Sequence, residues 1–598
     1  MPFFPVKVPP GVVKVDSDLA ATGRWIDADK VRFVRGMPEK VGGVQKLITD
    51  QFTGIARGAK AWNTYGGVNC LAFGTACNLY LVRNGTLNEI TPYRSDATSI
   101  SLTNPFETTN TSAIVTVTDA SHGIEAAGTD VVFSGASAVG GITIDGEYAV
   151  TEVVDADTYT ITHSSAATSS ATGGGSVTAN YELNCGNVDP TTLLGWGVGG
   201  WGQGYWGTDV SASSAITADI TSWALDPYGE DLVVNPLDGG IYIYDSSAGV
   251  QRPTLLSNAP AVSRYAFVTG ERYIFALGCT TIAGSQDNMT VRWPDVEDNT
   301  DWTPSSTNTA NERKLQGGTR LMAGSSLGDG LALVWSDAAC FRFQYTGSNE
   351  VYASNKIADH CGLVGPLAFT AANGQAFWMG AGEFWMYAGF VQPIPNAQDV
   401  SDWVYRNINT THISKSFCLY NPLFNEVWFV FPTGVATEPD TYVHVNLDTF
   451  AWTPGTWDRS SAAQYWTGER RPVMFGTDGY VYLHDVSTNP DEDSSAMEAY
   501  IELGATDIQG GNSSVDIFGF VPDFQRQTGD MTLYIWGRDH PRDSDFMTDT
   551  VTIESSDKLV DTRCAGRQFG FKLTTNTLGG DFRLGKSALE VSGAGSQR

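Results

Sequence analysis

The 598-residue sequence has few charged residues, and most of them are acidic. Asp, Glu, Lys and Arg make up only 17% of the chain, with 36 basic residues against 66 acidic ones and a net charge of −30. A protein that grips nucleic-acid phosphates carries a basic surface, so such gripping is not expected. Two interpretations of the acidity stay open. It keeps a large protein soluble, or it lines a channel through which DNA slides without being held.

Cysteines are few and scattered. The eight lie at positions 70, 77, 185, 279, 340, 361, 418 and 564, with no CxxC pair among them. Several stand in apolar stretches, where cysteine acts as a small core residue. We therefore expect neither a disulfide nor a zinc site, which favours assembly in a reducing compartment.

Signals for membrane insertion, secretion and catalysis are missing as well. There is no run of about 18 apolar residues, and residues 1–5 lack the charged and apolar regions of a signal peptide. The seven histidines form no HxxxH or HxH pair, and no GxSxG, Walker loop or GxGxxG after a strand is present. The sequence predicts no membrane span, no enzyme activity, no metal and no cofactor.

What the chain does contain is a recurring two-strand phrase: an apolar run, a turn with Gly or Asp, and an aromatic-rich alternating strand. Clear copies cover 71–82, 231–245, 331–345, 376–387 and 473–485, and weaker ones begin near 272 and 426. From 232 onward the starts are about 40 to 60 residues apart, as in β-propeller blades. We predict an all-β fold built on a propeller of five to eight blades.

Changes in composition divide the chain into four parts. Residues 1–100 hold a Pro-rich arm and the first blade or blades. Residues 101–185 form short alternating strands, with no Lys or Arg in 101–181, which predicts a small β-barrel module inserted in a propeller loop. Residues 186–496 hold the remaining blades. An acidic linker then leads to residues 497–598, which we interpret as a C-terminal β-sandwich.

A glycine- and tryptophan-rich segment covers residues 195–207. Glycine at nearly every second position prevents a stable helix, and the flat apolar side chains are Trp196, Trp201, Tyr205 and Trp206. Two interpretations stay open: inter-subunit packing on a neighbouring copy, or a loop pinned to its own core.

Isolated polar residues give only weak indications of a site. A retaining glycosidase needs two carboxylates about 5–5.5 Å apart, and Asp295, Glu297 and Asp301 are candidates, although solvated turn carboxylates explain them more simply. Residues 491–493 have the acidic side chains of a calcium-binding loop but lack its Gly and its distal Glu, so a charged linker explains them more simply. His122 is predicted to cap a turn rather than act as a base.

Three segments carry a family resemblance. Residues 23–36, Gly-Arg-Trp-Ile-Asp-Ala-Asp-Lys-Val-Arg-Phe-Val-Arg-Gly, with Gly42-Gly43, resemble the N-terminus of tail proteins of short-tailed bacteriophages. The module with Gly128–Gly135 and Asp145–Tyr148 resembles small β-barrel modules of phage tail and baseplate proteins. The ending from Trp536 to Gly585 is similar to the C-terminal β region of the tail nozzle (packaged-DNA stabilisation) family.

Membership would imply a structural virion protein. Nozzle proteins form a homohexameric ring below the portal and the adaptor, or head-to-tail connector, and continue the DNA channel. They retain packaged DNA and conduct it at ejection. The implied partners are further copies of the chain, the adaptor, a tail needle or plug, and tail fibres. Genomic double-stranded DNA would pass through without sequence-specific binding. The implied location is the virion tail, after assembly in the host cytoplasm.

The rival function is a secreted glycan-binding or glycoside-hydrolysing β-propeller that uses the tryptophan-rich loops as sugar platforms. The missing signal peptide counts against it. A cytosolic interaction propeller is a third class, for which the WD and kelch signatures are missing.

Overall fold

The computed structural model describes residues 3–14, 20–192, 217–347, 351–466, 468–489, 495–507, 514–540, 543 and 546–593. In these ranges the chain is almost entirely β, with one α-helix, α1 (Gln398–Asn407), and two short 3₁₀ helices, η1 (Ser246–Ala248) and η2 (Ile413–Lys415). No helix among them is long and apolar enough to cross a membrane. The chain forms two compact units: residues 1–51, 337–342 and 355–598, and residues 52–336 and 343–354.

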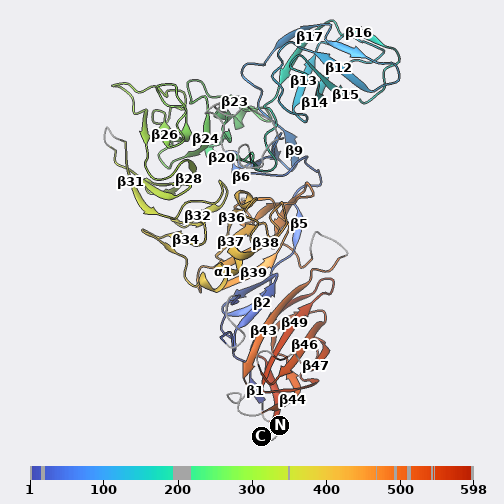
Figure 1. Cartoon of the computed structure of the whole chain (residues 1–598), viewed down its shortest axis with the longest axis vertical. Helices are drawn as coiled ribbons and strands as arrows, with labels where there is room; N and C mark the ends of the chain where they lie inside the picture. Colours follow the sequence, from blue (N-terminus) through green and yellow to red (C-terminus); the bar gives the residue numbers. More distant parts are fainter. Residues whose placement is uncertain are drawn as a thin grey trace, which may run out of the picture. The chain divides into compact units, whose positions relative to one another are not determined.

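Seven four-stranded antiparallel sheets in the described ranges are the blades, so the predicted β-propeller fold is confirmed (Figure 1). The first four blades are β6 (Ala59–Asn63), β7 (Asn69–Gly74), β8 (Leu79–Arg83) and β9 (Thr86–Glu89); β20 (Trp223–Tyr228), β21 (Asp231–Pro236), β22 (Tyr242–Tyr244) and β23 (Thr254–Leu255); β24 (Ser263–Val268), β25 (Ile274–Cys279), β26 (Thr290–Trp293) and β27 (Asn311–Lys314); and β28 (Leu321–Gly328), β29 (Leu331–Ser336), β30 (Ala339–Tyr345) and β31 (Tyr352–Asp359). The other three are β32 (Phe369–Ala372), β33 (Gln375–Met379), β34 (Phe384–Tyr387) and β35 (Val391–Pro393); β36 (Phe417–Asn421), β37 (Glu426–Phe431), β38 (Thr441–Asn446) and β39 (Trp452–Thr456); and β40 (Ser461–Ala463), β41 (Val473–Phe475), β42 (Val481–His484) and β5 (Val44–Lys46).

Each copy of the sequence phrase falls on the middle of a blade. The five clear copies are the second and third strands of their sheets, and the two weak copies contain the second strands β25 and β37. All six residues of each of these two strands are buried. A strand that is covered on both faces is a continuous apolar run in the sequence. This explains why the inner strands of the blades could be recognised from the sequence.

Close contact between the first two blades depends on a glycine. A Cβ on Gly74, the last residue of β7, would lie 2.2 Å from the indole ring of Trp223 in β20. The Trp223 indole N–H donates to the carbonyl of Thr75 at 2.7 Å. The missing side chain therefore makes room for an indole that joins the two sheets.

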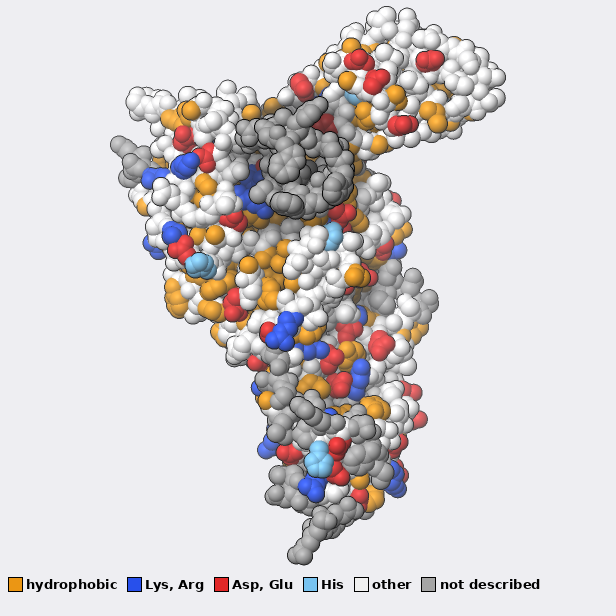
Figure 2. Space-filling view, in the orientation of Figure 1, with side chains coloured by type: hydrophobic (Ala, Val, Ile, Leu, Met, Phe, Trp, Pro, Cys, Tyr) orange, Lys and Arg blue, Asp and Glu red, His pale blue; other side chains and the backbone are white. Residues whose placement is uncertain are grey.

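The inserted module is a near-closed eight-stranded barrel between the first and second blades, as predicted. Its strand order is β10-β17-β13-β14-β15-β12-β11-β16. Their bounds are β10 Ile100–Thr103, β11 Phe106–Thr108, β12 Ile114–Thr118, β13 Asp130–Ser134, β14 Gly146–Val153, β15 Thr158–Thr162, β16 Ala171–Gly173 and β17 Ser176–Tyr181. It has its own apolar core, and Figure 2 shows carboxylates scattered on its surface. The short pair β18 (Thr191–Thr192) and β19 (Thr217–Ala218) precedes the second blade.

The C-terminal β-sandwich consists of three sheets around one core. Their orders are β1-β51-β44-β48, β2-β43-β49-β46-β47 and β3-β4-β50-β45. The bounds are β1 Phe3–Pro5, β2 Trp25–Asp29, β3 Val31–Val34, β4 Met37–Lys40, β43 Ala499–Asp507, β44 Val515–Val521, β45 Phe524–Thr528, β46 Met531–Arg538, β47 Phe546–Ile553, β48 Val560–Gly566, β49 Gln568–Thr575, β50 Asp581–Leu584 and β51 Ala588–Gly593. Strands from residues 3–40 thus complete a sandwich whose other strands come from residues 499–593.

Candidate functional site

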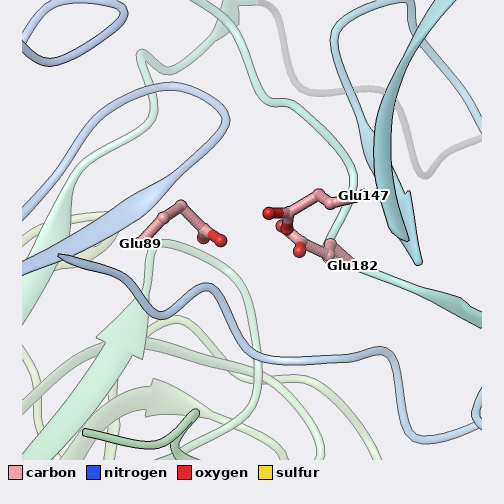
Figure 3. A group of neighbouring side chains, drawn as sticks. All are labelled: Glu89, Glu147 and Glu182. Atoms are coloured by element: carbon pink, nitrogen blue, oxygen red, sulfur yellow. The ribbon is translucent and has the colours of Figure 1, made fainter. Parts of the chain in front are cut away.

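Three glutamates from separate parts of the second unit converge in the described structure. Glu89 ends β9 of the first blade, Glu147 lies in barrel strand β14, and Glu182 follows barrel strand β17. One carboxylate oxygen of each lies within 4.8 Å of the others, and Figure 3 shows the three side chains pointing toward one another. We call these residues and Arg252 the carboxylate cluster.

Arg252 supplies the opposite charge. Its guanidinium lies 3.0 Å from Glu89, 2.6 Å from Glu147 and 2.6 Å from Glu182. It also lies over the ring of Tyr93, 4.7 Å from the ring centre. Arg252 comes from the loop before β23 of the second blade, so the cluster joins the barrel to two blades.

The cluster has one cation for three carboxyl groups, and the pKa values reflect that imbalance. Burial, a hydrogen bond to Glu147 and the charge of Glu89 raise the pKa of Glu182 to about 10. Burial also raises the pKa of Glu89 to about 7, against the attraction of Arg252. For Glu147 burial is outweighed by the hydrogen bond with Glu182 and by Arg252, which together lower its pKa. Glu182 is therefore the carboxyl group of the cluster that most favours its protonated form.

The carboxylate cluster is better suited to joining the barrel to the two blades than to catalysing a reaction. The Glu182 side chain is 1% exposed, so its proton is out of reach of a substrate. Carboxylate oxygens are the ligands that hard cations prefer, and these three groups could hold one. However, the guanidinium already lies within 3.0 Å of all three carboxylates. A metal ion would have to displace Arg252.

A disulfide in the same unit corrects one sequence expectation. Cys77, between β7 and β8, is bonded to Cys185, which follows the barrel, across 108 positions of sequence. The expectation of no disulfide was wrong because the barrel insertion brings these two distant residues together, and cysteine spacing cannot show that. The inference of a reducing compartment rested on the absence of a disulfide and therefore loses its support. The other six cysteines are buried free thiols.

A second charged group lies on the blades of the same unit. Asp219 pairs with Arg264 of β24 at 2.5 Å and with Arg320 at 2.7 Å, and Arg264 also pairs with Asp238 at 3.1 Å. Two guanidinium groups are thus matched by two carboxylates. Because the carboxylates already compensate the charges of Arg264 and Arg320, we interpret these arginines as structural contacts between blades.

In the first unit, a buried ion-pair network anchors the N-terminal segment. Arg32 of β3 lies 3.0 Å from Asp485, which follows β42, and 3.5 Å from Glu426 of β37. Its guanidinium also lies 3.6 Å from the ring centre of Phe424. Burial raises the pKa of Glu426 to about 7, while Arg32 opposes the rise.

The residues singled out from the sequence do not form one site. Trp196, Trp201, Tyr205, Trp206 and the calcium-like residues 491–493 lie outside the described residues. The carboxylate of Asp295 accepts hydrogen bonds from Thr309, and that of Asp301 accepts one from Asn308 at 2.8 Å.

His122 is a turn-capping side chain, as predicted. Its Nδ1 accepts the backbone N–H of Ile124 at 3.0 Å. No sequence pattern indicates the carboxylate cluster, because its members are single acidic residues spread from position 89 to 182 and one arginine at 252.

No protein-family profile and no curated protein matches the sequence. Among solved structures the chain is similar to the phage phi92 endosialidase, at 12% identity over 82% of this chain and 81% of that one, with a TM-score of 0.20. It is also similar to YCF48 bound to D1 peptide (8% identity, 66% and 97% covered, TM-score 0.26) and to an ancestral GH74 enzyme (10%, 75% and 60%, TM-score 0.30). Likenesses at these TM-scores carry no argument about function.

Proposed function

We propose that the chain is a structural virion protein: the tail nozzle of a short-tailed bacteriophage, assembled as a homohexamer. The observation that carries the proposal is how the N-terminal segment is fastened. β1 pairs with β51, β2 pairs with β43, and β5 completes the last blade beside β42. A chain whose N-terminal strands are hydrogen-bonded to the edges of later sheets resists unravelling when it is pulled, and a nozzle that retains packaged DNA bears such a load.

The charge of the chain supports the same role. Six copies with a net charge of −30 each would repel DNA phosphates, so a duplex would pass without being gripped. The proposed neighbours are the adaptor on one side and a needle or plug and tail fibres on the other. The proposed location is the virion tail, and no enzyme activity is part of the role.

One observation removes an objection to the rival, a secreted glycan-binding or glycoside-hydrolysing propeller. The Cys77–Cys185 disulfide is typical of proteins that work in oxidising surroundings, which include both secreted proteins and virion surfaces.

Electron microscopy and mass photometry of the purified full chain test the proposal. Six-fold rings, and incorporation into virions when the chain is expressed with its phage, are the expected results. A chain that stays monomeric at micromolar concentration, stays outside virions and binds or cleaves saccharides would contradict the nozzle role and support the rival.

A further inference from the structure

A cavity of about 640 Å³ opens into the C-terminal sandwich. Three elements line it: the arm at residues 6–9, the turn between β3 and β4, and the segment between β50 and β51. Binding sites for small molecules have volumes of about 300–1,000 Å³. The cavity has the size of such a site, and none of its lining residues belongs to the carboxylate cluster.

The inner wall of the cavity is apolar. Trp25 and Phe571 line it, with their rings edge to face at 6.1 Å, together with Val6 and Leu584. All four side chains belong to the core of the sandwich and are at most 8% exposed, so each presents a small part of its surface to the cavity. An apolar chain entering here would be removed from water, which is worth about 25 cal/mol for each Å² that is buried.

The mouth of the cavity is basic, although the whole chain is strongly acidic. Lys7, Arg35 and Lys586 line it and are exposed, and among the described residues none of the three forms an ion pair. The single acid in the lining, Asp523, already accepts the backbone N–H of Lys586 at 2.7 Å. Three cations against one engaged carboxylate favour an anionic ligand.

The fold fixes the backbone that carries one of these cations. Arg35 and Gly36 form the two-residue turn between the paired residues Val34 and Met37. Both turn residues have positive φ, 52° and 79°, as the tight turns that suit a hairpin require. An arginine in this strained position costs stability relative to Asn or Gly, and its charge at the mouth offers a reason for its presence.

We propose that this cavity binds a small amphiphilic anion: an alkyl or acyl chain lies along the Trp25–Phe571 wall, and a carboxylate or phosphate head group meets Lys7, Arg35 and Lys586. Both head groups share the chemistry that the mouth selects. The proposal stands whether or not the chain forms a nozzle.

Isothermal titration calorimetry of the full chain with decanoate and with decyl phosphate, both below their micelle concentrations, tests it. We expect saturable binding of one equivalent of at least one probe, and which probe binds more tightly identifies the head group. Decyltrimethylammonium, with the same tail and a positive head, should bind at least ten-fold more weakly.

Three variants separate the two halves of the site. Lys7→Ala/Arg35→Asn/Lys586→Ala should weaken binding at least ten-fold, with Asn chosen because it tolerates positive φ. Val8→Trp, at a residue that lines the cavity, should block the apolar part. Lys558→Ala, an exposed lysine of the same sandwich outside the lining, should change affinity less than two-fold. No saturable binding, equal binding of the cationic probe, or unchanged affinity in the triple variant would overturn the proposal.

Discussion

Replacing Glu182 with glutamine should flatten the pH dependence of stability of the barrel. Glutamine has nearly the same size and polarity, but it cannot titrate. In the folded chain Glu182 has a pKa of about 10, against an ordinary value of 4.5. Between these two values the folded chain holds a proton that the unfolded chain releases.

The sign and size follow from proton linkage. Because the folded state binds the extra proton, the stability contributed by Glu182 is complete below pH 4.5 and is lost as the pH rises toward 10. Across that window the free energy of unfolding falls by about 1.4 kcal/mol per pH unit. From pH 6 to pH 8 the wild type should therefore lose roughly 3 kcal/mol that the Glu182→Gln variant keeps. Glu89, with a pKa of about 7, adds a smaller fall of the same sign to both proteins.

Urea unfolding of the full chain at pH 6, 7 and 8 provides the measurement. A hydrogen-exchange pulse at one fixed pH, read by mass spectrometry on peptides from residues 100–181, reports the folded fraction of the barrel. Glu152→Gln, at an exposed glutamate of the same strand as Glu147, is the matched control and should follow the wild type. Parallel pH dependences for wild type and Glu182→Gln would refute the conclusion that Glu182 keeps its proton in the folded chain.

Three further changes test other contacts. Arg32→Met leaves Glu426 as a buried charge without its partner and should lower the free energy of unfolding by about 3–5 kcal/mol; a loss below about 1 kcal/mol in urea titrations would show that the network is dispensable. Cys77→Ser should cost about 2–4 kcal/mol, seen as a lower melting temperature that reductant no longer changes, and continued sensitivity to reductant would contradict it. Gly74→Ala should cost about 1–3 kcal/mol by crowding Trp223, and an unchanged melting temperature would mean that the two blades separate easily.

The blades could be predicted from sequence because their inner strands carry the signal themselves. Strands such as β25 and β37 are buried along their whole length. Full burial requires consecutive apolar residues, and such a run can be recognised in a single sequence. The barrel could be predicted for a related reason: its segment contains no Lys or Arg, so its composition differs from that of the flanking segments. Both signals are local in the chain.

By contrast, the sequence of a strand does not show which other strand it pairs with. The alternation of Trp25, Val31 and Phe33 with charged neighbours is typical of a half-buried strand, and in the structure this segment forms two strands, β2 and β3. Nothing in that pattern indicates that the partner of β2 is β43, more than 470 positions away. The same limit hid the carboxylate cluster, since one glutamate among 66 acidic residues is conspicuous only when its neighbours in space are known.

The pairing of β1 with β51 and of β5 with β42 sets an order for biosynthesis. Strands β1 and β5 are synthesised before their partners and can pair only after residues 481–593 have been made. At about 5–20 residues per second, the early strands wait for roughly half a minute to two minutes with unpaired edges, which are prone to pair with other chains. The fastening that would make the mature protein resist force therefore leaves the nascent chain exposed, and its yield in the cell depends on how well those first strands are shielded.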